Sequence, residues 1–556
     1  MGLSTFVRQL LGLALIAMLL AAHGHAQTAP AWAGVVSARS VSIRRPAING
    51  SIGQSIGVDA AGNRYVAGAF YGTIQLDTVT ITAGTGDTHA YLAKYNPSGA
   101  VLWARTLETG LNATASEIAV DAAGNVYWAG SYRTYLTAGS VAFSGDYGAF
   151  LLKYNAQGVQ QWALDGGLYT EAGGIASDAT GNITIAGRFR NTVAFGGSSL
   201  TGGGQYCYRL SPAGVVQQAI RTSADPLSLV ASTTLCIDAA GNAYIGGGLI
   251  GSATYGTTTL SSPTNYEMFL YKLTPAGTVA WATLIPGGIY TDWVQGLATD
   301  AGGNVLVSGC TDLHSAPGSL FSSGMYVGLF SPQGTPRWQH TYPASLDGVP
   351  VDTDVASDGR GGYWLSGTFY LSTVVIGATT LRGAPCALVV RYDGQGTPVW
   401  VSQGVIVRPS STGLNTFSSS APSIVADANG NMSLTGGVAG QNAFGSFITT
   451  SNGDNVDSYL ATIAAGSILT ASRPAAAGLA LAAYPNPASG RVTLTLPVGG
   501  GQLELLDALG RRVRQLALPA TAGPCAVPLA GLAPGLYQLR ATLGNGQPAQ
   551  ATLQVE

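Results

Sequence analysis

One short phrase, Asp-x-x-Gly-Asn, recurs seven times along the chain and constrains its fold more than any other feature. The aspartates that begin the copies are Asp59, Asp121, Asp178, Asp238, Asp300, Asp358 and Asp427. In every copy one glycine follows three residues later and another nine residues later. Asparagine follows the first glycine in each copy except the sixth, where Gly362 replaces it. Fixed offsets repeated at this spacing indicate a repeat architecture.

Each copy belongs to a longer unit that predicts four strands. A short strand such as Ser55–Val58 leads into the Asp-x-x-Gly-Asn turn, and an alternating strand such as Tyr65–Phe70 follows it. A third strand, for example Ala149–Tyr154, ends at a second turn whose fourth residue is glycine. The fourth strand carries a tryptophan in most units (Trp103, Trp162, Trp281, Trp338 and Trp400), with Gln218 in the third. Four antiparallel strands about every 61 residues predict a propeller blade; the alternative is a solenoid or a row of small sandwiches.

The two ends of the repeat region favour a closed ring. The seventh unit stops after its third strand, Ser458–Ile463, and has no fourth strand of its own. The missing strand is present at the other end of the region, where Ala31-Trp32-Ala33 matches Ala280-Trp281-Ala282. Pairing of these segments would remove two exposed sheet edges. The sequence therefore predicts an all-β, seven-bladed β-propeller over residues 27–465, closed by an N-terminal strand.

The pattern D-x-x-G-N-x-Y-x-x-G, followed by F-L-x-K-Y and later by tryptophan, resembles the repeat of a family of secreted bacterial β-propellers. The resemblance covers about residues 31–464. It implies the fold and leaves the function open, because one fold serves many functions.

The N-terminus has the features of a secretory signal peptide over residues 1–26. Arg8 supplies a positive charge, residues 10–22 are apolar, and the small residues Gly24 and Ala26 suit a cleavage site. The apolar run is too short to span a bilayer. We therefore expect no integral membrane segment after signal cleavage.

The C-terminal part predicts a second domain. An Ala/Ser/Gly linker occupies residues 466–483, and residues 484–556 alternate short strands with Pro/Gly turns, as in a small β-sandwich. The motifs Y-P-N-P, D-x-L-G-R and L-x-P-G-L-Y-x-L resemble the type A C-terminal sorting domain of the type IX secretion system. The resemblance implies the type IX machinery as a partner and the cell surface or exterior of a Gram-negative bacterium as the location. The alternative is an ordinary ligand-binding sandwich.

Composition excludes some functions. Charged residues are only 9% of the chain and the net charge is −2, so we expect no nucleic-acid partner. The five cysteines (Cys207, Cys236, Cys310, Cys386 and Cys525) lack metal-ligand spacing. One disulfide is an alternative, but we expect buried thiols. The Asp-x-x-Gly-Asn turn lacks the alternating oxygens of a calcium loop.

Chemistry-bearing residues are few, and we assign no catalytic, cofactor-binding or metal-binding residue. His89, His314 and His340 are in no catalytic motif, and no nucleophile elbow, metalloprotease motif or phosphate loop is present. Asp352, Asp354 and Asp358 form an acidic cluster, and Glu117 occupies the position equivalent to Asp354. Cations recur on the third strands (Lys94, Lys153, Arg209, Lys272 and Arg391). Because these cations and the tryptophans repeat, we expect them to have structural roles.

The leading hypothesis is a secreted or cell-surface, non-catalytic propeller that binds glycan or protein. The variable segments between second and third strands, such as residues 71–88 and 132–148, are the expected binding loops, because they are rich in Thr, Ser, Gly and Tyr. One alternative is an extracellular polysaccharide lyase or hydrolase that uses Asp352 and Asp354. A structural matrix component is the other.

Overall fold

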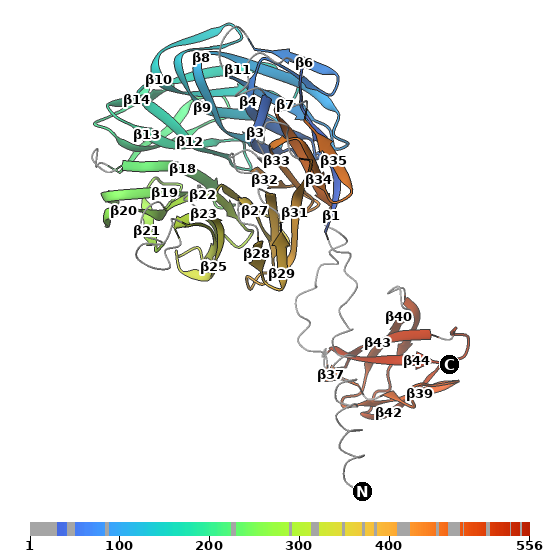
Figure 1. Ribbon diagram of the computed structural model, residues 1–556. Helices are drawn as coiled ribbons and strands as arrows, with labels where there is room; N and C mark the ends of the chain where they lie inside the picture. The colour runs from blue at the N-terminus through green and yellow to red at the C-terminus, as the bar shows by residue number, and fades with distance from the viewer. Residues whose placement is uncertain are drawn as a thin grey trace. The chain divides into compact units, whose positions relative to one another are not determined.

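The fold was analysed in a computed structural model, in which all regular structure of the described residues is β-strand (Figure 1). The residues described are 30–41, 50–83, 88–223, 229–287, 292–312, 322–346, 351–369, 373–382, 386–408, 423–451, 455–464, 479–481, 483–506, 512–533, 535–544 and 548–556. The expected signal peptide, most of the linker and His314 lie outside this set. The chain divides into two compact units, within Thr28–Ser467 and Ile468–Glu556.

In the first unit, each repeat forms four antiparallel strands that pair in chain order. The first strands are β3 (Gly50–Val58), the end of β8 (Val101–Val120), β12 (Thr170–Ser177), β18 (Leu229–Ile237), β22 (Trp293–Thr299), β26 (Thr353–Ser357) and β32 (Ser423–Ala426). The second strands are β4 (Arg64–Tyr71), β9 (Val126–Ala138), β13 (Ile183–Phe189), β19 (Ala243–Tyr255), β23 (Val305–Asp312), β27 (Tyr363–Phe369) and β33 (Met432–Ala439). The third strands are β7 (His89–Tyr95), β10 (Val141–Tyr154), β16 (Gly204–Leu210), β20 (Thr258–Leu273), β24 (Ser322–Phe330), β30 (Cys386–Tyr392) and β36 (Val456–Ala464). The fourth strands are the start of β8, β11 (Gln160–Leu168), β17 (Val216–Ser223), β21 (Val279–Ile285), β25 (Pro336–Leu346) and β31 (Pro398–Arg408), with β1 (Ala31–Ser37) serving the last repeat.

The first strands lie next to one another in repeat order. β3 contacts β8, and contacts then run through β12, β18, β22 and β26 to β32. β32 in turn contacts β3, so the first and last repeats are neighbours. Each first strand thus contacts the first strands of two other repeats.

The N-terminal strand β1 pairs antiparallel with β36, as predicted, but its register corrects the predicted match of Trp32. In four other repeats the tryptophan lies opposite the third-strand cation, as Trp103 does opposite Lys94. Gly34 takes that place in the last repeat, opposite Thr462, and Trp32 lies two residues earlier, opposite Ile463. Trp32 instead packs against Phe444, with ring centroids 5.1 Å apart.

The segments expected to be binding loops are largely β-hairpins. Residues 71–88 contain β5 (Thr73–Leu76) and β6 (Val79–Thr82), and residues 132–148 extend β9 and β10 into a hairpin. Further hairpins are the end of β19 with the start of β20, β14–β15 (Thr192–Phe195, Ser198–Thr201), β28–β29 (Thr373–Ile376, Thr379–Arg382) and β34–β35 (Gln441–Phe444, Phe447–Thr450). Alternate side chains on their first strands are buried, for example Ile74 and Leu76. Several pack on the fourth strand of the preceding repeat, as β14 does on β11. These segments therefore cover sheet edges.

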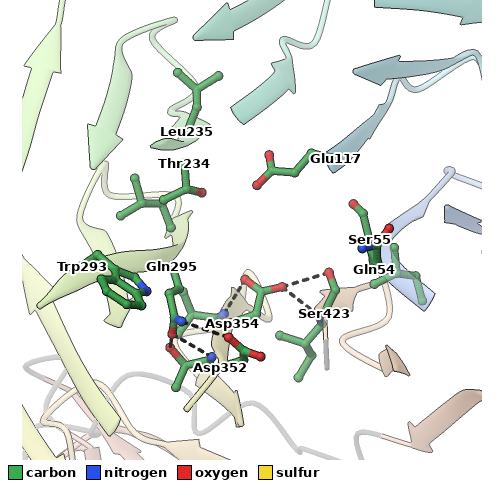
Figure 2. Close-up of a pocket in the computed structure, with 15 residues that line it drawn as sticks. Gln54, Ser55, Glu117, Thr234, Leu235, Trp293, Gln295, Asp352, Asp354 and Ser423 are labelled. Carbon is green, nitrogen blue, oxygen red and sulfur yellow. Dashed lines mark hydrogen bonds between the residues drawn. The ribbon is translucent and has the colours of Figure 1, made fainter. Parts of the chain in front are cut away.

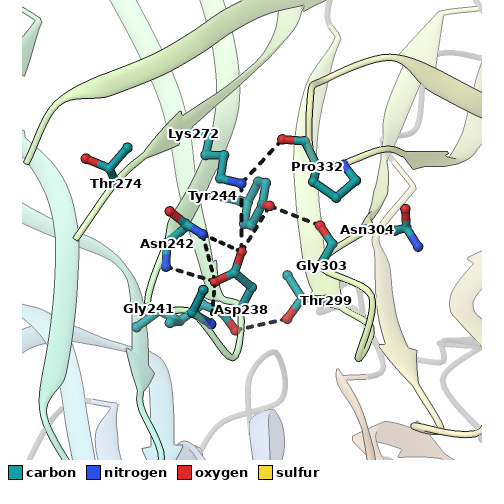
Figure 3. Close-up of polar contacts among 12 residues, drawn as sticks. Asp238, Gly241, Asn242, Tyr244, Lys272, Thr274, Thr299, Gly303, Asn304 and Pro332 are labelled. Atoms are coloured by element: carbon teal, nitrogen blue, oxygen red, sulfur yellow. Dashed lines mark hydrogen bonds and ion pairs between the residues drawn. The ribbon is translucent and has the colours of Figure 1, made fainter. Parts of the chain in front are cut away.

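The repeated turn links neighbouring repeats (Figure 3). Asp238 Oδ1 accepts the backbone N–H groups of Ala240 and Asn242 at 3.0 and 2.9 Å, and Oδ2 accepts the Asn242 amide at 2.8 Å. The Tyr244 hydroxyl lies 3.2 Å from Asp238 Oδ2 and 3.0 Å from the carbonyl oxygen of Gly303 in the next repeat. The repeated pattern is thus explained as a capped turn that also binds its neighbour.

The repeated cations and tryptophans have structural partners, as expected. Lys94 and Asp59 form an ion pair at 3.4 Å, and Arg391 and Asp358 form one at 3.0 Å. Lys272 Nζ donates to the carbonyl oxygen of Pro332 at 3.3 Å, and Trp281 Nε1 donates to the same oxygen at 3.0 Å. Each of the two ion pairs lies within one repeat, whereas the bonds to Pro332 join the fourth repeat to the fifth.

The second unit contains two sheets. One has the strand order β37 (Leu479–Ala480), β44 (Pro548–Val555), β43 (Gly535–Leu543), β40 (Gly501–Leu506) and β41 (Arg512–Ala517). The other has the order β38 (Ala483–Tyr484), β39 (Arg491–Leu496) and β42 (Gly523–Pro528). Val492, Leu494, Leu505, Val527 and Leu539 are buried in one shared core.

Candidate functional site

The residue four positions before each turn aspartate differs from repeat to repeat. The seven residues are Ser55, Glu117, Gly174, Thr234, Gly296, Asp354 and Ser423. A cavity of about 380 Å³ lies where their strands meet, and five of these residues line it. The lining also includes one aromatic and three polar residues, namely Trp293, Gln54, Gln295 and Asp352. The cavity is thus built by residues from six repeats.

Several lining side chains also join adjacent first strands. Ser55 Oγ accepts the N–H of Ile118 at 3.1 Å, and Glu117 Oε2 accepts that of Ile175 at 3.1 Å. Asp354 Oδ2 accepts the N–H of Ile424 at 2.9 Å. Each donor lies on the first strand of the next repeat. In that strand it directly follows the residue that occupies the same repeat position as the acceptor. The predicted equivalence of Glu117 and Asp354 is therefore confirmed in their contacts.

Asp354 and Gln295 are held firmly by the protein. Asp354 Oδ1 accepts the N–H of Val355 at 2.8 Å, and Oδ2 also accepts the hydroxyl of Ser423 at 3.0 Å (Figure 2). Gln295 Oε1 accepts the N–H of Thr353 at 3.0 Å, while its Nε2 donates to Asp352 Oδ1 at 3.2 Å. Both Asp354 oxygens are engaged, so this residue is a poor candidate for acid–base chemistry.

The carboxyl groups of the cavity titrate near neutral pH. Burial raises the pKa of Glu117 to about 8; the Asp354 charge adds to the rise, and hydrogen bonds from Ile175 and Thr234 oppose it. Burial also raises the pKa of Asp352 to about 6, against a hydrogen bond from Gln295, and that of Asp354 to about 6. Burial therefore favours the protonated form of Glu117 more strongly than that of Asp352 or Asp354.

One buried polar atom at the cavity has no partner in the described part of the chain. Gln54 Oε1 is inaccessible to bulk water and accepts no hydrogen bond there. Figure 2 places Gln54 and Glu117 on the side of the cavity opposite Gln295 and Trp293. An unsatisfied buried acceptor costs about 1–3 kcal/mol.

The structure separates the acidic residues singled out from the sequence. Asp352 and Asp354 meet Glu117 at the cavity, whereas Asp358 caps its own turn and pairs with Arg391. Trp293, Gln295 and Gln54 were missed, because neither repetition nor a motif marks them. Alignment of the repeats on the turn aspartate would have shown where polar residues replace one another.

The histidines and cysteines described lie outside the cavity lining. Nδ1 of the buried His89 is 3.3 Å from the Leu107 carbonyl oxygen, and His340 Nε2 is 2.7 Å from that of Gly396. Cys207, Cys236 and Cys525 are buried free thiols, as expected, while the Cys386 side chain lies outside the described set. Burial raises the pKa of Cys207 to about 12, so this thiol is not a nucleophile at neutral pH.

The comparison with protein families identifies the C-terminal part. Residues 482–553 match the family described as secretion system C-terminal sorting domain, which confirms the predicted sorting domain. This domain implies export to the cell surface or extracellular space. No helix of the described residues is long and apolar enough to cross a membrane.

Similarity to other proteins is otherwise remote. None of the curated proteins compared with the chain matches it. Among solved structures, a Dyadobacter fermentans protein of unknown function is 12% identical with a TM-score of 0.36, covering 61% of this chain and 95% of that one. A PL25 ulvan lyase is 9% identical with a TM-score of 0.37 (71% and 93% covered). The K499G mutant of the NanB sialidase from Streptococcus pneumoniae is 8% identical with a TM-score of 0.34 (76% and 70% covered). Such low scores carry no argument about function.

Proposed function

We propose that the protein is an exported, non-catalytic β-propeller of seven blades that binds a saccharide unit in its central cavity. The ring would span residues 27–465, closed by β1, and a type A sorting sandwich over residues 484–556 would follow the linker at 466–483. The pairing of β1 with β36 and the contact of β32 with β3 support the ring. The signal peptide over residues 1–26 remains a prediction from the sequence.

The observation that carries the binding proposal is a polar cavity whose lining departs from the repeat. Structural tasks recur in every repeat, so residues that differ between repeats are the ones available for specificity. At about 380 Å³ the cavity is near the lower end of ligand pockets, which suits one small unit. We therefore place recognition at the axis instead of on the hairpins.

The chemistry of the lining favours a sugar. Trp293 offers an aromatic face on which the C–H face of a pyranose can pack. Asp352 and Gln54 Oε1 are acceptors for hydroxyl groups, and the protonated Glu117 is a donor. An aromatic face beside closely spaced donors and acceptors matches a ring that is apolar on its faces and polar around its rim.

The test is binding of the exported, folded protein to an array of mono- to hexasaccharides of common hexoses, pentoses and uronic acids. We expect Trp293→Ala and Gln54→Ala to weaken binding at least tenfold, whereas Thr80→Ala on an exposed hairpin should leave it unchanged. Thermal melts would confirm that each variant is folded. Binding that survives both cavity substitutions, or no binding to any sugar, would overturn the proposal.

A polysaccharide lyase or hydrolase is the second candidate, because the cavity contains carboxyl groups whose pKa values are raised to different extents by burial. A protonated Glu117 could act as a general acid and an ionised Asp352 as a base. This hypothesis assigns the acid to Glu117 and not to Asp354, because both Asp354 oxygens already accept hydrogen bonds from the protein. Release of reducing ends from a bound polysaccharide, abolished by Glu117→Gln and by Asp352→Asn, would support it. Binding without any product would leave the non-catalytic proposal in place.

A further inference from the structure

A second cavity of about 220 Å³ adjoins the first. It shares Glu117, Thr234 and Gln295 with the first cavity, and Glu171 and Arg188 belong to it alone. The two cavities therefore share part of their walls, and the second lies toward the paired strands β12 and β13.

Glu171 and Arg188 form a cross-strand pair at this extension. They are register partners, and Arg188 Nε lies 2.6 Å from Glu171 Oε2. Their side chains keep 31% and 42% of their surface exposed, so the pair is accessible. A guanidinium and a carboxylate held side by side offer donors and acceptors in one plane.

Tyr147 and Arg133 extend this pair outward. Burial and the Glu171 charge raise the pKa of Tyr147, while Arg188 and Arg133 oppose the rise, so all three charged groups lie near its hydroxyl. The Arg133 guanidinium lies 5.1 Å from the centroid of the Tyr147 ring. Stacking of this kind restrains an otherwise flexible cation.

The backbone at this edge is strained. Thr134, Tyr147 and Tyr169 have φ values of 63°, 69° and 56°, and only Asp77 shares this property among the other non-glycine residues described. The Tyr169 N–H donates to the Tyr147 carbonyl oxygen at 2.6 Å, which fixes the two residues together. Each such residue costs about 1–3 kcal/mol, and such strain concentrates at ligand-binding sites. The Tyr169 side chain remains 45% exposed.

We propose that Arg133, Tyr147, Tyr169, Glu171 and Arg188 form a second saccharide subsite, so that the ligand is an oligosaccharide of at least two units. This inference rests on the proposed function: one unit would occupy the axial cavity and the next would lie on this edge. The Glu171–Arg188 pair would bind hydroxyl groups of the second unit, and the tyrosines would pack against its ring. Binding should therefore strengthen from mono- to disaccharide.

The experiment measures dissociation constants of the full chain for the mono- to hexasaccharides on the array. Arg133→Ala and Tyr169→Ala should each weaken binding of the longer sugars about tenfold and leave the monosaccharide affinity unchanged. Arg382→Ala, which removes an exposed arginine from β29, is the matched control.

The outcomes separate this inference from the proposed function. If the edge variants bind every sugar like the unmodified protein while Trp293→Ala does not, the second subsite is refuted and the axial site stands. Equal losses for mono- and oligosaccharides would also refute the subsite, because they would assign these residues to the first site. If no sugar binds, or if Trp293→Ala has no effect, both proposals fail.

Discussion

Replacement of Glu117 by glutamine tests whether the axial cavity buries a carboxyl group. The substitution keeps an oxygen that can accept the N–H of Ile175, now 3.1 Å from Glu117 Oε2. It removes only the ability to ionise. Because burial raises the pKa of Glu117 to about 8 from 4.5, the folded protein holds this proton more tightly than the unfolded chain.

The sign of the effect follows from proton linkage. Below pH 4.5 the carboxyl group of Glu117 is protonated in both the folded and the unfolded state. The stabilisation of the folded state by the protonated group is then fully present. As the pH rises toward 8, the unfolded chain releases the proton while the folded protein must retain it or bury a charge. The free energy of unfolding therefore falls by up to about 1.4 kcal/mol per pH unit, or about 5 kcal/mol over the whole interval. Because part of the side chain faces the cavity, we expect about half of this.

Differential scanning calorimetry from pH 4.5 to 8.5 would measure the effect. For a unit of the size of Thr28–Ser467 the unfolding entropy is about 0.9 kcal/mol/K, so 2–5 kcal/mol corresponds to a few degrees in Tm. Glu117→Gln should match the unmodified protein at pH 4.5 and melt a few degrees higher at pH 8. Glu108→Gln, which changes an exposed carboxylate, should show no such trend. A Tm difference for Glu117→Gln that does not vary with pH would refute the burial argument.

One deletion and three substitutions test the packing between repeats. Deletion of residues 27–40 removes the partner of β36, so Tm should fall by more than 10 °C, and an unchanged melt would contradict the ring. Gly158→Ala should cost about 1–3 kcal/mol by denaturant titration, because φ is 73° and the new Cβ would lie 2.7 Å from the Trp103 ring. Gly359→Ala, also at positive φ but with open space, should cost less. Tyr244→Phe should lose about 1 kcal/mol with its hydrogen bond to Gly303, and a neutral result would show that water replaces that bond.

The sequence predicted the strands well, because their turns are specified locally. An aspartate, a glycine at positive φ and an asparagine are sufficient to close the turn at Asp238. The hairpins between second and third strands were not predicted, although their turns have two features in common. The first turn residue has positive φ, as at Asp77 and Gly139, and apolar residues alternate before it.

The axial site could not be predicted because its residues come from distant parts of the chain. Gln54 and Ser423 line one cavity although more than half of the sequence separates them. The displacement of Trp32 was equally hidden, since it is a two-residue shift in the pairing of β1 with β36. A match of residue types identified the right strand for β1 but not its register.

The same seven positions explain why a cavity forms at the axis instead of a sealed core. Each first strand presents a backbone N–H to the strand before it, and Ser55, Glu117 and Asp354 satisfy three of these donors. Glycine at two other positions permits close approach, since a Cβ on Gly174 would lie 2.5 Å from the nitrogen of Leu235. Strands with glycine therefore close together, whereas the longer acids keep their carboxyl groups in the space between strands. Because both kinds of residue satisfy the needs of the ring, the choice between them is free to set the shape and charge of the cavity, and a ligand can be selected without altering the fold.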